Sequence, residues 1–121
     1  MAKLKIIANP ISGSGKVKLF LERLSQALAS NNIPHDIYLT AGPGDATIHA
    51  QSAPTAGYTA LLCLGGDGTI NEVINGILSA KRVIPIGIIP FGSGNVIAKA
   101  LGIKRNIKQF IQLYQAGQVR T

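Results

Sequence analysis

The chain has 121 residues, of which 46% are hydrophobic and 14% charged, and a formal net charge of +7 at pH 7. This length suits one domain with its own core, and the single cysteine, Cys63, excludes a framework of disulfides or cysteine-bound zinc. No apolar run reaches the ~20 residues of a membrane span, and the N-terminal run is too short for a signal peptide. We therefore expect a cytoplasmic protein.

Strand and helix patterns alternate along the chain, with glycine or proline between them. Apolar runs predict strands at residues 3–9, 35–40, 58–64 and 83–89. Helical spacing and capping residues predict helices at residues 16–30, 45–53, 70–78, 95–101 and 107–114. Asp45 is expected to cap the second of these helices at its start, and Gly117 the last at its end. Residues 118–121 resemble the start of another strand, so we expect a second domain to follow.

This alternation predicts an α/β fold: a Rossmann-like parallel sheet with helices on both faces, in three α/β/α layers. Ligands of such sheets bind beyond the carboxyl ends of the strands. Glycine-containing loops follow the first, third and fourth predicted strands. All three loops are therefore expected at the ligand-binding edge of the sheet.

The loop after the third predicted strand carries the strongest functional signal. Residues 65–68 read Gly-Gly-Asp-Gly and lead into a helix, whose free N–H groups favour an anion such as phosphate. Thr69 and Glu72 have capping-box spacing and are expected to satisfy donors of that helix. Asp67 would repel phosphate unless a cation lies between them, and magnesium is the natural intermediary. The loop thus predicts a magnesium-dependent phosphate site.

The other two glycine loops are less specific. Residues 9–15 (Asn-Pro-Ile-Ser-Gly-Ser-Gly) suit either a plain turn or a phosphate cradle, and Val17 replaces the Ser or Thr of a Walker A loop. In residues 90–95 (Pro-Phe-Gly-Ser-Gly-Asn), Ser93 can bond a nucleotide, whereas Asn95 suits a helix cap equally well. Their position at the same predicted edge favours a shared function.

In this order and spacing, the loops resemble the diacylglycerol kinase and sphingosine kinase catalytic-domain family. The resemblance rests on Asn-Pro-x-Ser-Gly at 9–13, Gly-Gly-Asp-Gly-Thr-x-x-Glu-Val-x-Asn-Gly at 65–76 and Pro-x-Gly-Ser-x-Asn at 90–95. Thr40 with residues 44–46 also resembles a family segment. By motif match, Asp67 is expected to act catalytically through magnesium, and ATP is expected to contact Asn9, Pro10, Ile11, Ser12, Gly13, Thr40, Gly65, Gly66, Asp67, Gly68, Thr69, Ile70, Asn71, Glu72 and Ser93.

The resemblance implies an enzyme of phospholipid metabolism that transfers the γ-phosphate of ATP to the hydroxyl of diacylglycerol or of a sphingoid lipid. Residues 1–121 would form its N-terminal nucleotide-binding domain. A C-terminal β-sandwich domain, absent from this chain, would carry the general base and much of the lipid site. By itself, this chain is expected to bind nucleotide weakly and not to turn over.

Two other functions stay open. One is a kinase of the NAD kinase type, whose related fold also carries Gly-Gly-Asp-Gly. The other is a non-catalytic module that binds nucleotide or an anionic membrane, because no acidic residue follows Glu72 while seven basic residues do. A lipid kinase also has to reach its lipid at a membrane, so peripheral membrane contact is compatible with the function of a lipid kinase. Six aromatic residues and no recognisable nucleic-acid motif argue against nucleic acid as a partner.

Overall fold

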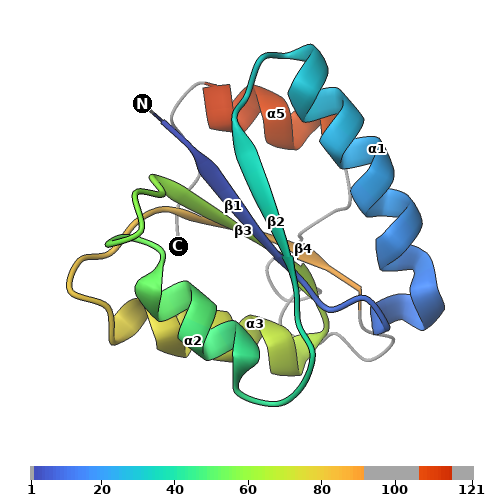
Figure 1. Ribbon diagram of the computed structural model, residues 1–121. Helices are drawn as coiled ribbons and strands as arrows, with labels where there is room; N and C mark the ends of the chain where they lie inside the picture. The colour runs from blue at the N-terminus through green and yellow to red at the C-terminus, as the bar shows by residue number, and fades with distance from the viewer. Residues whose placement is uncertain (1, 92–106, 116–121) are drawn as a thin grey trace.

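The structure, a computed structural model, describes residues 2–91 and 107–115. Within these residues, four strands form one parallel sheet in the order β2-β1-β3-β4 (Figure 1). The strands are β1 (Leu4–Ala8), β2 (His35–Leu39), β3 (Ala60–Gly65) and β4 (Ile86–Pro90). The helical segments are η1 (Ser12–Gly15), α1 (Lys16–Ser30), α2 (Asp45–Ser52), α3 (Asp67–Leu78) and α5 (Ile107–Gln115). The predicted α/β fold is confirmed.

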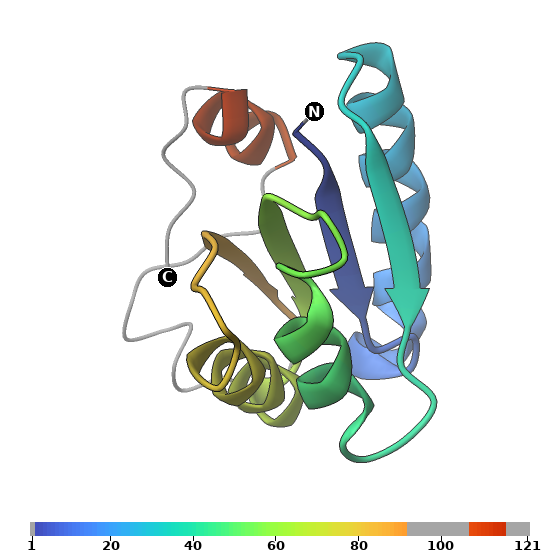
Figure 2. The ribbon, with the colours of Figure 1, turned by 60° about the vertical axis from the view of Figure 1, so that its left-hand side comes forward.

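Helices cover both faces of the sheet, α1 and α5 on one side and α2 and α3 on the other (Figures 1 and 2). Alternate residues of β1 divide between the two cores: Leu4 and Ile6 pack with the first pair of helices, and Ile7 packs with the second. A strand covered on both faces is apolar throughout, which accounts for the low charged fraction of the chain. None of the described helices is long and apolar enough to cross a membrane.

The winding of the chain changes direction at the neighbouring strands β1 and β3. Strand β1 leads through α1 to β2 at one edge, whereas β3 leads through α3 to β4 at the other. The pairing of Ala8 with Leu64 keeps the carboxyl ends of the two strands level. Their loops therefore diverge toward opposite faces and leave a crevice, which is where open α/β sheets bind ligands.

The starts of α2 and α3 correct both capping predictions. Gly44, with a φ of 88°, is the N-cap of α2, so Asp45 lies inside the first turn and does not cap it. Gly66 is the N-cap of α3, so the capping box predicted for Thr69 and Glu72 is wrong. In both places a glycine takes the boundary position, which the polar residues behind it had been expected to hold.

The remaining elements follow the predictions closely. The helix predicted at residues 16–30 is confirmed, and β4 begins at Ile86 rather than at residue 83. Pro85 explains that later start, because it has no N–H to donate to the ladder. The helix predicted at 95–101, the cap at Gly117 and the strand predicted at 118–121 lie outside the described residues.

Helices α2 and α3 meet at Gly76. A Cβ atom at this position would lie 2.4 Å from the carbonyl oxygen of Thr47 and 2.8 Å from the Cβ of Ala50. No real side chain tolerates such distances, so the two helices approach this closely only because residue 76 is glycine. Both helices begin at the carboxyl edge of the sheet, after the loops that follow β2 and β3.

We expect Gly76→Ala to lower the free energy of unfolding by ~1–3 kcal/mol, the usual cost of overpacking a tight contact. Urea denaturation followed by circular dichroism measures the effect. Gly68→Ala is the matched control, because it lies in the same helix and its added Cβ would meet nothing within 4 Å. Equal stability of Gly76→Ala and the wild type would contradict the close contact.

Candidate functional site

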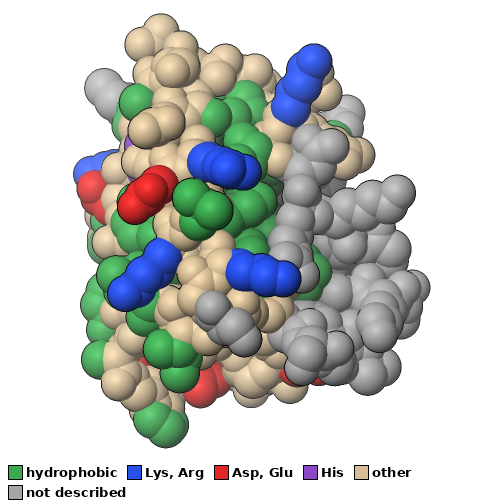
Figure 3. All heavy atoms as spheres, turned by 90° about the vertical axis from the view of Figure 1, so that its right-hand side faces the viewer, with side chains coloured by type: hydrophobic (Ala, Val, Ile, Leu, Met, Phe, Trp, Pro, Cys, Tyr) green, Lys and Arg blue, Asp and Glu red, His purple; other side chains and the backbone are tan. Residues whose placement is uncertain are grey.

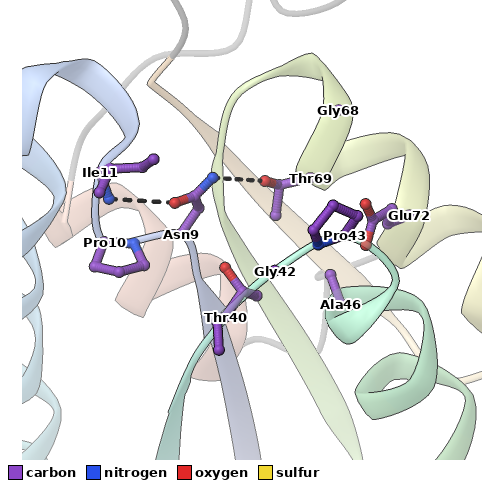
Figure 4. Close-up of a pocket in the computed structure, with 11 residues that line it drawn as sticks. Asn9, Pro10, Ile11, Thr40, Gly42, Pro43, Ala46, Gly68, Thr69 and Glu72 are labelled. Atoms are coloured by element: carbon purple, nitrogen blue, oxygen red, sulfur yellow. Dashed lines mark hydrogen bonds between the residues drawn. The ribbon is translucent and has the colours of Figure 1, made fainter.

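A cavity of about 380 Å³ opens at the carboxyl edge of the sheet, at the crevice between β1 and β3 (Figure 4). Three segments form its walls: the loop after β1, the loop after β2 and the first turns of α3. The lining residues are Asn9, Pro10, Ile11, Thr40, Ala41, Gly42, Pro43, Ala46, Gly68, Thr69 and Glu72. Seven of these eleven were predicted as site residues, and the topology brings together segments that are distant in sequence, such as Asn9 and Thr69, which lie 60 positions apart.

Asn9 connects the first glycine loop to the second. Its Oδ1 accepts the N–H of Ile11 at 3.2 Å, a turn typical of asparagine, and its own N–H donates to the carbonyl of Leu64 at 2.9 Å. Its Nδ2 donates to Oγ1 of Thr69 at 3.5 Å, at the limit of hydrogen-bond distance (Figure 4). Asn9 thus extends β1 by one residue and orients the loop beside α3.

The first turn of α3 presents backbone N–H groups at the cavity. The first hydrogen bond inside the helix joins the N–H of Ile70 to the carbonyl of Gly66 at 3.0 Å, so the three amides before Ile70 have no helical partner. The positive end of the helix dipole adds to their attraction for an anion. Gly68 leaves the approach open, because a Cβ there would meet nothing within 4 Å.

Gly65 has a different role from Gly68. A Cβ at Gly65 would lie 2.7 Å from the Cβ of Thr69, so this glycine allows α3 to pack against the end of β3. The Gly-Gly-Asp-Gly sequence therefore combines a packing glycine with one that leaves space for a ligand.

Asp67 is the first residue of α3, and one oxygen of its carboxylate lacks a partner. Among the described residues, its Oδ1 is the buried side-chain oxygen for which no hydrogen bond forms. An unpaired buried acceptor is costly, and the energetic cost falls when a cation or donor occupies the space beside it. Across residues 2–91 and 107–115, no group of three His, Cys, Asp or Glu side chains could hold a metal ion. Within these residues, a metal at Asp67 would therefore have at most one other such side chain as a ligand.

Glu72 fastens the loop after β2 to α3. Its Oε1 accepts the N–H of Gly44 at 3.1 Å, and its backbone carbonyl accepts the hydroxyl of Thr47 at 3.0 Å. Figure 4 shows its carboxylate beside Pro43. Glu72 is the charged side chain among the lining residues, and the structure uses it to hold one wall in place.

The other predicted site residues lie around the cavity rather than along it. Ser12 and Gly13 lie in η1, where a Cβ at Gly13 would come within 3.1 Å of the carbonyl oxygen of Phe91. The side chain of Ile70 is completely buried in the core, so only its backbone can face a ligand, and that of Asn71 is exposed. Gly65, Gly66 and Asp67 precede the lining part of α3. Ser93 lies outside the described residues.

Phe91 brings the start of the third glycine loop beside the first. Its N–H donates to the carbonyl of Gly65 at 2.9 Å, and its buried ring packs edge-on against Phe20 of α1, with centroids 5.3 Å apart. The close approach of its carbonyl to Gly13 completes this contact. The three loops therefore begin at one edge, as their positions after strands predict.

One wall of the cavity consists mostly of residues that the sequence did not predict. Ala41, Gly42, Pro43 and Ala46 line the cavity, and none of them was predicted as a site residue. Small residues and a proline carry no catalytic signal of their own. Their position directly after Thr40, at the end of a strand, was the available clue.

The fold and these contacts define a Rossmann-like α/β domain with glycine loops that face each other across the switch point of its sheet. Residues 3–121 match the sequence model of the diacylglycerol kinase catalytic domain family. The chain belongs to the diacylglycerol kinase catalytic-domain family, a family of lipid kinases.

Individual relatives agree with this assignment. The sequence is 37% identical over 105 residues to a diacylglycerol kinase of Bacillus subtilis and 34% identical over 115 residues to one of Staphylococcus carnosus. These alignments cover 87% and 95% of this chain but only 35% and 38% of the relatives. The crystal structure of a diacylglycerol kinase from Bacillus anthracis matches with a TM-score of 0.76 and 30% identity, over 95% of this chain and 40% of that one. The chain thus spans little more than a third of the length of these relatives.

The role of Glu72 gives a direct test. We expect Glu72→Ala to lower the free energy of unfolding by ~1–3 kcal/mol, because the N–H of Gly44 loses its charged acceptor. Glu72→Gln, which keeps an acceptor oxygen, should lose less. Glu22→Ala on the exposed surface of α1 is the control and should stay within ~0.5 kcal/mol of the wild type. If urea denaturation shows that Glu72→Ala lowers the free energy of unfolding no more than Glu22→Ala does, Glu72 does not stabilise the loop after β2.

Proposed function

We propose that this chain is the nucleotide-binding domain of an ATP-dependent lipid kinase, which transfers the γ-phosphate of ATP to the hydroxyl of diacylglycerol or of a sphingoid lipid. The observation that carries the proposal is the start of α3, where open backbone amides, Gly68 and the unpaired Oδ1 of Asp67 meet at the switch point of the sheet. The family relationship gives the reaction class, and this geometry supports the location of the phosphates.

The phosphates of ATP would bind between the loop after β1 and the first turn of α3. The amides before Ile70 point along the axis of a helix whose dipole favours negative charge. Thr69 and Thr40 add hydroxyl groups to the lining, and Asn9 holds the first loop opposite. In phosphoryl transfer, positioning and neutralisation of charge provide most of the catalysis, and such a cradle supplies both.

Asp67 fits a magnesium ion that is shared with the phosphates. Its Oδ1 is a buried carboxylate oxygen without a partner, the kind of hard ligand that magnesium prefers. Magnesium typically takes one or two carboxylates from the protein and completes its shell with phosphate oxygens and water, which agrees with the absence of a larger acidic cluster in the described residues. The ion would offset the charge that develops on the phosphates during transfer.

The acceptor lipid and the general base would belong to a second domain. The alignments span only 35% and 38% of the relatives, and we propose that a β-sandwich domain in the remaining part supplies much of the lipid site. This chain alone would then bind nucleotide without transferring phosphate. The full-length protein should phosphorylate a diacylglycerol or sphingoid substrate from ATP, and NAD is the competing acceptor to test beside it.

Binding of ATP tests the proposed site. We expect this chain to bind ATP weakly in the presence of magnesium, and Asp67→Ala to lower the affinity by about tenfold or more, which is ~1.4 kcal/mol per factor of ten. Calorimetry with and without EDTA measures both effects. Asp36→Asn, an exposed aspartate on β2 away from the cavity, is the control. If the affinity for ATP is the same with and without magnesium and is unchanged in Asp67→Ala, the proposed role of this carboxylate is refuted.

Peripheral membrane contact is a separate proposal. The sequence after Glu72 contains only basic charged residues, among them Lys104, Arg105 and Lys108, and Lys108 is exposed on α5. Figure 3 shows that the face carrying α1 also bears Lys and Arg side chains among apolar ones. An anionic membrane surface would attract either group.

We expect neutral substitutions at Lys104, Arg105 and Lys108 to reduce sedimentation of the protein with vesicles that contain phosphatidylglycerol. A charge-matched variant that neutralises Lys16, Lys18 and Arg23 on α1 is the comparison. If sedimentation falls in the α1 variant and not in the variant of Lys104, Arg105 and Lys108, the basic residues of α1 make the membrane contact and the expectation for the C-terminal residues is wrong.

A further inference from the structure

Asp45 holds the loop after β2 through its side chain. Its Oδ2 accepts the backbone N–H of Ala41 at 2.7 Å and the hydroxyl of Tyr38 at 3.1 Å. Ala41 lies in the wall of the cavity, whereas Asp45 and Tyr38 do not. The carboxylate predicted to cap α2 therefore turns back toward the loop that precedes the helix.

This loop has few other attachments. The N–H of Thr40 extends the sheet by bonding to the carbonyl of Ala8 at 2.9 Å, and the N–H of Gly44 bonds to Glu72 at the far end. Between these two points, the carboxylate of Asp45 accepts the N–H of Ala41 at 2.7 Å. The N–H of Asp45 also donates a longer hydrogen bond, of 3.3 Å, to the carbonyl of Gly42. Loss of the carboxylate would therefore release the middle of the wall and leave its ends attached.

Tyr38 in turn fixes the carboxylate. Its ring stacks on the imidazole of His49, with centroids 3.4 Å apart and planes inclined by 18°, and Nδ1 of His49 lies 3.1 Å from the amine of Lys5. The hydroxyl of Tyr38 thus reaches Asp45 from a rigid position on β2. The side chain of Asp45 is held between a strand, a helix and the loop that it supports.

The charge state of Asp45 agrees with this arrangement. The N–H of Ala41, followed by the hydroxyl of Tyr38, lowers the pKa of the Asp45 carboxyl, so the group stays ionised at neutral pH. The titratable neighbours are Tyr38, whose pKa is raised by burial and by Asp45, and His49, whose pKa is lowered by burial and by Lys5. Across the loop, Glu72 bonds to Gly44.

We propose that Asp45 is a positioning residue for the nucleotide: it fixes Ala41, and with it the wall formed by residues 40–43, while Tyr38 holds its carboxylate in place. The proposal rests on the proposed function, because a bound nucleotide is what the wall would contact. A wall ordered before the ligand arrives spares the ligand the entropic cost of ordering it, so affinity should depend on a residue that lies outside the cavity.

The test compares Asp45→Ala, Asp45→Asn and Tyr38→Phe with matched controls. A second pair of the same chemistry lies away from the cavity: the hydroxyl of Tyr58, which precedes β3, donates to Oδ2 of Asp36 on β2 at 2.6 Å. Asp36→Asn and Tyr58→Phe therefore remove equivalent groups without touching the wall. Two readouts apply to each variant: affinity for ATP with magnesium by calorimetry, and hydrogen exchange of the Ala41 amide by NMR.

We expect Asp45→Ala to accelerate exchange at Ala41 and to weaken ATP binding by about tenfold. Asp45→Asn keeps an acceptor oxygen and should recover part of the affinity, which a purely electrostatic effect of the charge on α2 would not. Tyr38→Phe should lose about threefold. In the wild type, the Ala41 amide shift should titrate with a pKa below the ordinary value for aspartate, since protonation of Asp45 removes the acceptor.

Three results would overturn the proposal. They are unchanged exchange at Ala41 in Asp45→Ala, faster exchange with unchanged ATP affinity, and equal losses of affinity in the Asp36 and Tyr58 controls. If Asp45→Ala fails to fold, wild-type affinity in both Asp45→Asn and Tyr38→Phe overturns it instead. Failure of the wild type to bind ATP would overturn the proposed function and is distinguishable, because exchange at Ala41 still reports whether Asp45 holds the loop.

Discussion

The parallel pairing of β1 with β3 is the constraint on which the candidate site depends. These strands are distant in sequence, and their pairing brings the loop that begins at Asn9 level with the loop that begins at Gly66. Because the helices that follow lie on opposite faces, the two loops diverge and expose the start of α3 between them. A sheet with another strand order would contain the same motifs and no common cavity. The chemistry of the motifs is therefore local, but their cooperation is a property of the topology.

Three carboxylates lie near this edge, and their partners give each a different role. Asp45 and Glu72 accept backbone N–H groups from two different points of one loop, so both are already bonded to the protein. Asp67 keeps a buried oxygen without a partner. A carboxylate that is satisfied inside the protein stabilises structure, whereas one that is buried and unsatisfied gains most from a ligand. This difference separates Asp67 from its neighbours more clearly than sequence position does.

The sequence predicts those parts of the structure that depend on local periodicity. Helix α1 and the four strands follow from apolar spacing, and the location of the glycine loops follows from the α/β pattern. Helix starts were predicted less well, because Gly44 and Gly66 compete with polar residues for the N-cap and tertiary contacts decide between them. The wall after Thr40 was missed for a related reason: its small residues carry no signal of their own, and the structure shows that the carboxylate of Asp45 holds the backbone of Ala41. Sequence patterns thus reveal glycine loops and helix starts more readily than residues that position a wall.

The contacts that fix the described walls all join residues of this chain. Asn9 connects the loop after β1 to α3, Glu72 connects α3 to the loop after β2, and Gly76 lets α2 and α3 pack closely behind them. A cavity ordered by its own domain is ready before a ligand binds, so a ligand need not supply the free energy to order it. Catalysis of phosphate transfer has a further requirement, an acceptor hydroxyl placed in line with the phosphate. In the proposed function, nucleotide binding is the task of this domain, whereas phosphate transfer needs a second surface that presents the acceptor hydroxyl.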